Sequence, residues 1–130
     1  IHNLMKARNP DYNILVTDSV NIKGCKQGEY VLGGQDLELK SNDCVVLKGT
    51  NQLAGSVLSM NKALKNVIQN AQVPTEHAIK AVTSNPARLM GIDHVKGRIC
   101  VGFDADFAIL NNEFEVCATM ISGKFAYMKD

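Results

Sequence analysis

Asp18 is the residue whose type and position in the sequence most directly suggest a catalytic role. It follows the unbroken apolar run ILV at residues 14–16 and Thr17, with no glycine or proline to make an ordinary turn. A run without alternation predicts a parallel strand covered on both faces. Ligands and catalytic groups gather at the carboxyl ends of such strands, so Asp18 would stand where a carboxylate can move protons. The alternative is that Thr17 and Asp18 only finish the strand and satisfy free backbone N–H groups.

The cysteines and histidines show no spacing typical of a metal site. There is no CxxC pair and no HxH or HExxH pattern, so we expect no metal binding by this chain alone and interpret the histidines as exposed or packing side chains. The cysteines are interpreted as reduced, mostly buried thiols, and with no secretory signal or long apolar run this indicates the cytoplasm. The residues concerned are Cys25, Cys44, Cys100, Cys117, His2, His77 and His94.

Composition limits the classes of function. The 130 residues are 45% hydrophobic, as expected of one globular domain rather than of a disordered or membrane-spanning chain. Fourteen Lys and Arg against thirteen Asp and Glu leave a formal charge of +1, and the basic residues are scattered. Neither nucleic acid nor an anionic membrane surface is therefore an expected partner.

Apolar spacing predicts a helix at the start of the chain. Ile1, Leu4 and Met5 lie at i, i+3 and i+4, and the pattern stops before Pro10. Neither an initiator methionine nor a capping residue precedes it, so we expect the chain to be a piece of a longer protein. After the strand at 14–16 we expect small antiparallel strands at 30–32, 37–39 and 44–47 with a polar turn at 41–43, a helix at 57–71 capped by Ser56 or Ser59, and shorter helices after caps at Thr75 and Asn85.

The pattern changes near residue 95. From Gly97 onward it predicts strands alone, and the glycines and the asparagine pair divide them at hairpin spacing. The expected strands are 98–101, 105–110, 114–121 and 124–128. The chain thus divides into an α/β part and a small β part.

Four stretches resemble one known family. In order they are "ILVTDS", "GTNQLAGSVLSMNKALKNVI", "TSNPARLMGI" and "KGRICVGFDADFAIL". Together they resemble the C-terminal part of the N-acetylglucosamine-6-phosphate deacetylases, a family of the amidohydrolase superfamily, from about residue 14 to about residue 127. The last stretch is shared by many amidohydrolases, whereas "VTD" combined with "LAGSxLSM" is narrower. The resemblance implies an α/β fold: a C-terminal fragment of a (β/α)8 TIM-like barrel, its last strand and helices, at 1–95, and strands of a small β-sandwich domain at 96–130.

The resemblance also assigns roles. Asp18 matches the family's general base and acid, which takes a proton from a water on a divalent metal, zinc or iron, and passes it to the departing amine; zinc lowers the pKa of such a water to about 7. Its metal ligands, a glutamate and two histidines, lie on earlier strands outside this chain. Ser19 stands where the family usually has alanine. The stretch contacting the sugar phosphate substrate matches Leu53, Ala54, Gly55 and Ser56.

A physical reason supports the second assignment, although a plain capped helix start is its alternative. Gly55 lets backbone approach a ligand closely, and a helix N-terminus behind it would offer free N–H groups.

From the resemblance we expect the parent protein to deacetylate N-acetylglucosamine 6-phosphate as a cytoplasmic homodimer. This chain alone should be inactive, because its single barrel strand would leave orphan backbone groups that cost about 1–3 kcal/mol each.

Three other interpretations stay open at this stage. One is another amidohydrolase, such as a dihydroorotase-like ring hydrolase. A second is a non-catalytic truncated or structural fragment. The third is an unrelated α+β domain that matches by chance, which the recurrence of four stretches in order disfavours.

Overall fold

The computed structural model describes residues 2–41 and 44–129. That description does not include Ile1, the side chains of His2 and Leu4, or residues 42 and 43. The apolar face expected for Ile1 and Leu4 and most of the expected turn at 41–43 therefore lie outside it. The chain divides into two compact units, residues 16–60 and residues 1–15 with 61–130. The expected domains, 1–95 and 96–130, concern the complete protein and stay a prediction.

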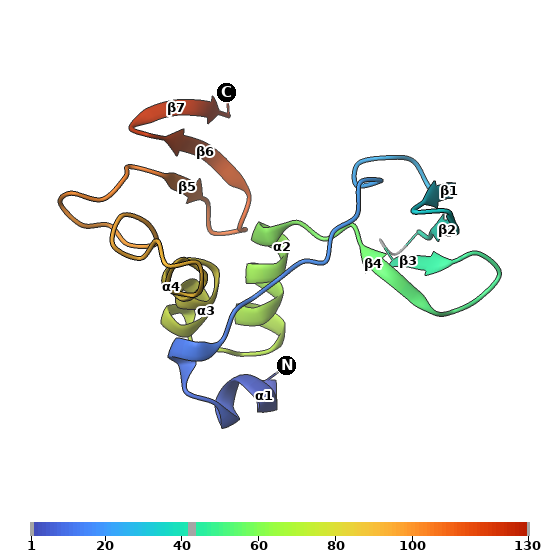
Figure 1. Ribbon diagram of the computed structural model, residues 1–130, viewed down its shortest axis with the longest axis horizontal. Coiled ribbons are helices and arrows are strands. Elements are labelled where there is room, and N and C mark those ends of the chain that lie inside the picture. The colour runs from blue at the N-terminus through green and yellow to red at the C-terminus, as the bar shows by residue number, and fades with distance from the viewer. Residues whose placement is uncertain (1, 42–43, 130) are drawn as a thin grey trace. The chain divides into compact units, whose positions relative to one another are not determined.

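The unit of residues 16–60 contains a four-stranded antiparallel sheet in the order β1-β2-β3-β4 (Figure 1). Its core is formed by Ile22, Leu37, Leu39 and Val45, the last fully buried. The three small strands expected from the sequence are confirmed, and a fourth is added. The strands are β1 (Gly28–Leu32), β2 (Gln35–Leu39), β3 (Cys44–Leu47) and β4 (Leu53–Ser56).

The added strand corrects the interpretation of "LAGS". These residues do not precede a helix directly but form β4, which pairs with β3 through Val46 opposite Leu53 and Cys44 opposite Ser56. The helix α2 begins only at Met60. Because Ser56 is held in a strand, it cannot cap that helix, and the helix N-terminus invoked for substrate binding does not exist at this position.

The second unit contains short helices around a core of Leu64, Val67, Val73 and Ala78. The helix expected at 57–71 is α2 continued by a π-helical segment, and the short helices after residues 75 and 85 are confirmed. Neither expected cap residue caps its helix, because α3 begins at Thr75 itself and α4 begins at Ser84, one residue before Asn85. The helical elements are α1 (His2–Ala7), a 3-10 turn η1 (Pro10–Tyr12), α2 (Met60–Lys65), the π-helical η2 (Asn66–Asn70), α3 (Thr75–Val82) and α4 (Ser84–Leu89).

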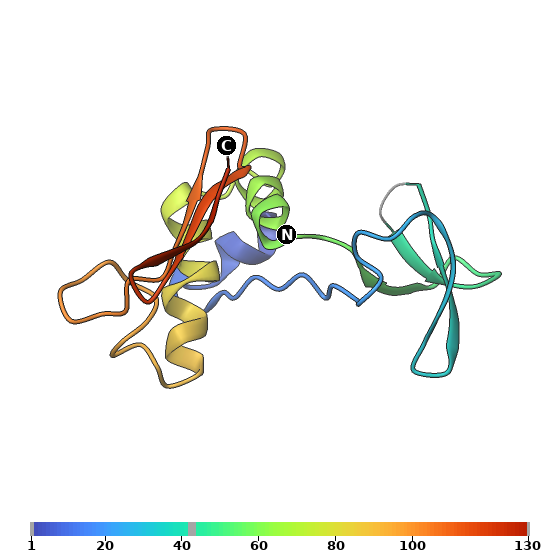
Figure 2. The same ribbon diagram turned by 90° about the horizontal axis from the view of Figure 1, so that it is seen from above.

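A three-stranded antiparallel sheet completes this unit. The strands β5 (Phe107–Leu110), β6 (Val116–Ile121) and β7 (Lys124–Met128) lie side by side in that order, as Figures 1 and 2 show. Three of the four expected strands are thus confirmed. The fourth, at 98–101, is not a strand: Ile99 is 87% and Val101 100% exposed, and no strand in the described part of the chain pairs with them.

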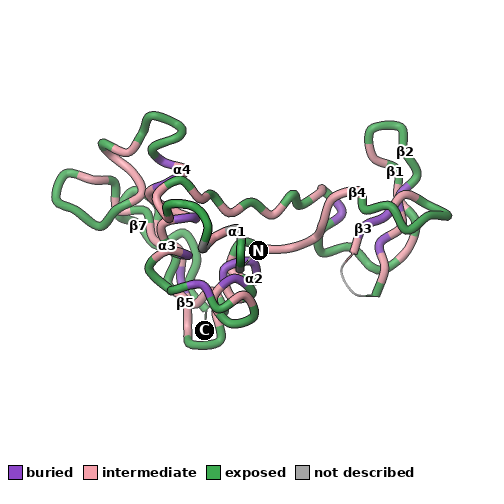
Figure 3. The backbone as a smooth tube through the Cα atoms, turned by 90° about the horizontal axis from the view of Figure 1, so that it is seen from below, coloured by how far each residue is buried: buried purple, intermediate pink, exposed green. Residues whose placement is uncertain are grey.

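The buried strand expected at residues 14–16 is also not formed. Ile14 is 37% and Val16 71% exposed, and the alternation of exposed and half-buried backbone along this segment is visible in Figure 3. Leu15 donates its N–H to the carbonyl of Ala81 in α3 at 2.9 Å, so its hydrogen bond goes to a helix and not to a strand. A parallel strand needs neighbouring strands, and none pairs with residues 14–16 among the described residues.

The chain therefore has a mixed α/β composition with two antiparallel sheets. Within the described residues, no helix combines the length and the apolar character that a membrane crossing requires.

Candidate functional site

The segment carrying Asp18, residues 17–20, lies beside β4 within the unit of residues 16–60; we call it the Asp18 segment. Ser19 and Ser56 form a parallel β-bridge. The N–H of Ser56 donates to the carbonyl of Asp18 at 2.8 Å, and the N–H of Val20 donates to the carbonyl of Ser56 at 2.8 Å. The structure thus brings together the two stretches that the sequence singled out, although more than thirty residues separate them.

The hydroxyl of Ser56 adds a side-chain contact to this pairing. It donates to the carbonyl of Thr17 at 2.6 Å and accepts the N–H of Leu58 at 3.1 Å. Ser56 therefore holds the carbonyls on both sides of the Asp18 α-carbon, that of Thr17 with its side chain and that of Asp18 with its backbone.

Asp18 has an uncommon backbone conformation. Its φ is +50°, in the left-handed region that side chains other than glycine rarely occupy. Aspartate tolerates this region better than most residues, yet such conformations cost about 1–3 kcal/mol and persist where surrounding contacts determine them. Here those contacts come from Ser56, and they leave Asp18 exposed to solvent.

Gly55 is required by the close approach of the two stretches. A Cβ at this position would lie 2.6 Å from Val20 Cγ1, 3.1 Å from the Asp18 carbonyl oxygen and 3.9 Å from Asp18 Oδ2, and the glycine φ is +92°. Gly55 was chosen by resemblance, with close approach of its backbone to a ligand as the physical reason; in the structure it approaches the Val20 side chain and the backbone of Asp18. Of its neighbours, Leu53 is 69% exposed, whereas Ala54 packs against the core of the sheet.

The described residues do not provide a metal site. No group of three or more His, Cys, Asp or Glu side chains that could hold an ion occurs among them. His94 is exposed and His77 half-buried. The cysteines form no disulfide among the described residues, but Cys25 and Cys100 are exposed and Cys44 and Cys117 only partly buried, so the expectation of mostly buried thiols is wrong.

The stretch "KGRICVGFDADFAIL" forms a structural network that the sequence analysis missed. Lys96 Nζ pairs with Asp104 at 2.8 Å and with Asp106, and the other Asp106 oxygen accepts the N–H of Ser122 at 2.7 Å. The hydrogen bonds from Lys96 and Ser122 lower the pKa of Asp106, and those to Asp104 and Asp106 raise the pKa of Lys96. One lysine followed within ten residues by two aspartates was the sequence pattern that could have predicted these ion pairs.

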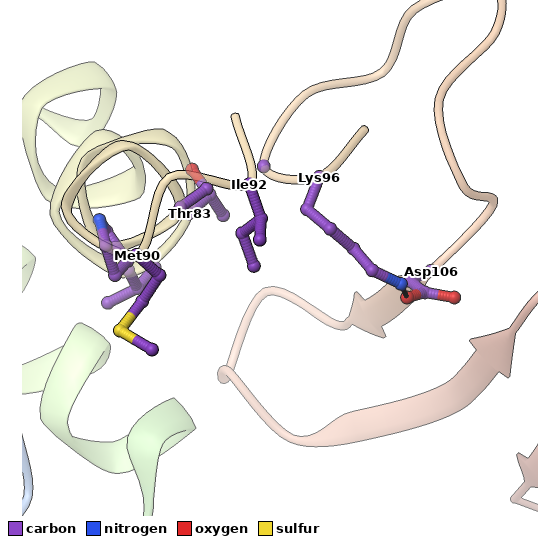
Figure 4. Close-up of a pocket in the computed structure, with 9 residues that line it drawn as sticks. Thr83, Met90, Ile92, Lys96 and Asp106 are labelled. Carbon is purple, nitrogen blue, oxygen red and sulfur yellow. Dashed lines mark hydrogen bonds and ion pairs between the residues drawn. The ribbon is translucent and has the colours of Figure 1, made fainter. Parts of the chain in front are cut away.

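This network borders a hollow lined mainly by apolar side chains, including Val82, Met90 and Ile92 (Figure 4). In the close-up, the Lys96 ammonium points at the Asp106 carboxylate rather than into free space. None of the predicted site residues lines the hollow.

Asn85 joins α4 to the 3-10 turn near the start of the chain. It is 3% exposed, and its amide donates to the carbonyls of Pro10 at 2.8 Å and Asn13 at 2.7 Å. Its own oxygen accepts from Arg88 at 3.2 Å. Asn85 is thus a buried structural amide.

Comparison with known proteins places this geometry in context. The model of the family described as "Amidohydrolase family" matches residues 13–126. The chain is 36% identical to N-acetylglucosamine-6-phosphate deacetylase of Bos taurus over 114 residues, which are 88% of this chain and 28% of that protein. It is 34% identical to N-acetylglucosamine-6-phosphate deacetylase of Bacillus subtilis over 115 residues, which are also 88% of this chain and 28% of that protein. The crystal structure of the N-acetylglucosamine-6-phosphate deacetylase of Thermotoga maritima superposes with a TM-score of 0.90 at 27% identity, covering 98% of this chain and 34% of that one. The chain thus spans about three tenths of the length of the relatives it matches, and the resemblance found in the sequence is confirmed.

Proposed function

The chain belongs to the amidohydrolase family, and from this premise we propose that it is the C-terminal part of a deacetylase that converts N-acetylglucosamine 6-phosphate to glucosamine 6-phosphate and acetate. The named relatives support the reaction and the substrate. The observation that carries the proposal is the pairing of the Asp18 segment with β4 through Ser56. In this pairing Asp18, the acid–base group that we propose, lies directly beside the stretch that we propose to contact the sugar phosphate.

In this proposal Asp18 transfers protons. Its carboxylate accepts a proton from the attacking water and delivers it to the departing amine, a role typically worth about 10²–10⁴ in rate. Two features of Asp18 suit that role. Its side chain is exposed and forms no ion pair within the described residues, and its backbone is held in place by hydrogen bonds to Ser56.

Amidohydrolases are generally metal-dependent. When bound, a divalent ion such as zinc or iron polarises a carbonyl and makes water more acidic. The described residues do not fit such an ion. We therefore propose that its ligands lie in the part of the protein outside this chain, and that the 130-residue chain alone is inactive.

The complete protein would also supply the missing strands. We propose that residues 1–95 belong to a (β/α)8 barrel, in which residues 14–16 become the last parallel strand, and that residues 96–130 belong to a small β-sandwich. The exposure of Ile14, Val16, Ile99 and Val101 supports this, because apolar segments without partners are what a chain shows when its neighbours lie elsewhere in the polypeptide.

The proposed ligand is a small amino-sugar phosphate. Leu53, Ala54 and Gly55 would contact it, the exposed Leu53 with its side chain and the glycine through its backbone. A cytoplasmic homodimer remains part of the proposal. It rests on the family resemblance.

The test is acetate release by the complete protein. Purified protein should release acetate from N-acetylglucosamine 6-phosphate and should not open dihydroorotate; the reverse preference would identify another amidohydrolase. Asp18→Asn should lower kcat by about 10²-fold or more with metal content near that of the wild type. Asp36→Asn, which neutralises an exposed carboxylate on β2 of the same sheet, is the matched control and should keep wild-type turnover. Normal turnover of the Asp18 variant would reject the catalytic assignment.

A further inference from the structure

Ser56 makes more contacts to the Asp18 segment than any role in substrate binding requires. Its N–H, carbonyl and hydroxyl are all used, toward Asp18, Val20 and Thr17 respectively. We infer that the Ser56 hydroxyl is a positioning group for the Asp18 carboxylate rather than a contact to the sugar phosphate. This inference rests on the proposed function, in which Asp18 transfers protons.

The geometry follows from the two peptide planes that meet at the Asp18 α-carbon. Each peptide unit is planar, so the direction of the Asp18 Cα–Cβ bond, from which the carboxylate extends, is set by the orientations of the plane before and the plane after it. The oxygen of the first plane belongs to Thr17 and that of the second to Asp18. Ser56 bonds both, at 2.6 Å with its hydroxyl and at 2.8 Å with its N–H.

The hydroxyl controls the plane that determines φ. Asp18 has a φ of +50°, a conformation that an aspartate would readily leave without restraint. A rotation of the Thr17 peptide plane toward ordinary φ values would break the bond to Ser56 Oγ and swing the carboxylate to a new direction. The hydroxyl of Ser56 therefore stabilises the positive φ of Asp18, and through it the direction in which the Asp18 side chain leaves the backbone.

The hydrogen-bonding capacity of Ser56 supports this reassignment. A serine hydroxyl has one donor hydrogen and two acceptor lone pairs. The donor is used on Thr17 and one lone pair accepts the N–H of Leu58. A phosphate or a substrate carbonyl needs donors, and Ser56 could offer its hydrogen only by releasing the Thr17 carbonyl.

The test compares three variants of the complete protein. Ser56→Ala removes the hydroxyl and leaves both backbone bonds of β4; we expect kcat to fall about 10- to 100-fold with KM unchanged, because misplacing a reacting group by about 1 Å can cost 10²-fold. Ser56→Thr keeps a hydroxyl in a strand, where a β-branched side chain is favoured, and should restore most of the lost kcat. Ser19→Ala is the matched control: its exposed hydroxyl has no partner in the described part of the chain, and turnover should stay at the wild-type value.

The outcomes separate the inference from the proposed function. A raised KM with kcat preserved would show that Ser56 binds substrate and would overturn the inference, as would wild-type values of both constants. A wild-type protein inactive on the sugar phosphate would reject the proposed function instead. Crystal structures of the wild-type and Ser56→Ala proteins then decide the positioning question without activity: we expect Asp18 to leave positive φ or its carboxylate to move, and an unchanged Asp18 would overturn the inference.

Discussion

Replacing Gly55 by alanine should disturb the candidate site through two separable costs. The new Cβ would lie 2.6 Å from Val20 Cγ1 and 3.1 Å from the Asp18 carbonyl oxygen, closer than van der Waals contact. Val20 cannot simply rotate away, because it packs against the core of Ile22, Leu37, Leu39 and Val45. Overpacking of this type costs about 1–3 kcal/mol, and the φ of +92° adds about 1–3 kcal/mol for a residue with a side chain.

A second glycine in the same unit isolates the steric part. Gly49 has a φ of +74°, but a Cβ there would meet nothing within 4 Å. Gly49→Ala should therefore pay only the backbone cost, and Gly55→Ala should be less stable than it by about 1–3 kcal/mol. Chemical denaturation of both variants of the complete protein measures this difference, and acetate release measures whether the Asp18 segment has moved.

The expected result is a large loss of both stability and kcat in Gly55→Ala and near-normal kcat in Gly49→Ala. Equal free energies of unfolding for the two variants would refute the steric reasoning. Lower stability of Gly55→Ala with unchanged kcat would show that the pairing of β4 with the Asp18 segment supports the fold without positioning the carboxylate.

Two further predictions concern the rest of the chain. Asn85→Ala should lower the free energy of unfolding by about 1–3 kcal/mol, because the carbonyls of Pro10 and Asn13 lose their buried amide donor; denaturant titration measures it. Asp106→Asn should be destabilising at neutral pH, and the difference in stability from wild type should shrink as pH falls below about 4. The reason is that the hydrogen bond from Lys96 lowers the pKa of Asp106 in the folded state, so the stabilisation by the ionised carboxylate is present above the ordinary aspartate pKa and is lost when Asp106 is protonated. Melting temperatures measured across acidic pH check the sign.

Matched variants make both measurements specific. Asn112→Ala removes an exposed amide without a partner among the described residues and should change stability by less than about 0.5 kcal/mol. Glu113→Gln removes an exposed carboxylate that forms no ion pair in the described part of the chain, and should keep a melting temperature close to that of the wild type at neutral pH. If the Asp106→Asn difference instead grew with acidity, the direction of its pKa shift would be wrong.

Sequence patterns predicted the elements whose formation is local. The glycines and alternating residues of β1 and β2 and the helical spacing of α3 were sufficient, since a hairpin or a short amphipathic helix is specified mainly by its own residues. The segment 14–16 failed for the opposite reason. Its apolar residues predict a strand, but a parallel strand exists only through neighbours, and the described residues provide none.

The candidate site was predicted in its residues but not in its arrangement. Asp18 was found by its place after an apolar run and the "LAGS" stretch by resemblance, yet a helical start was expected where β4 forms. The helical period that begins at residue 57 concealed the strand, because Ser56 before such a pattern is typical of a cap. Pairing of β4 with β3 and with the Asp18 segment is nonlocal, and a single sequence carries no direct signal of it.

The sheet in residues 16–60 explains how two distant stretches keep one geometry. Val20 lies in the Asp18 segment, Ala54 lies in β4, and both pack against the same buried core of that sheet. A shift of either stretch along the other would therefore expose core residues as well as break the bonds at Ser56. Because these contacts all lie within residues 16–60, the local conformation of Asp18 is determined inside this unit, whereas the metal, the remaining barrel strands and the reaction itself depend, in our proposal, on residues outside the chain.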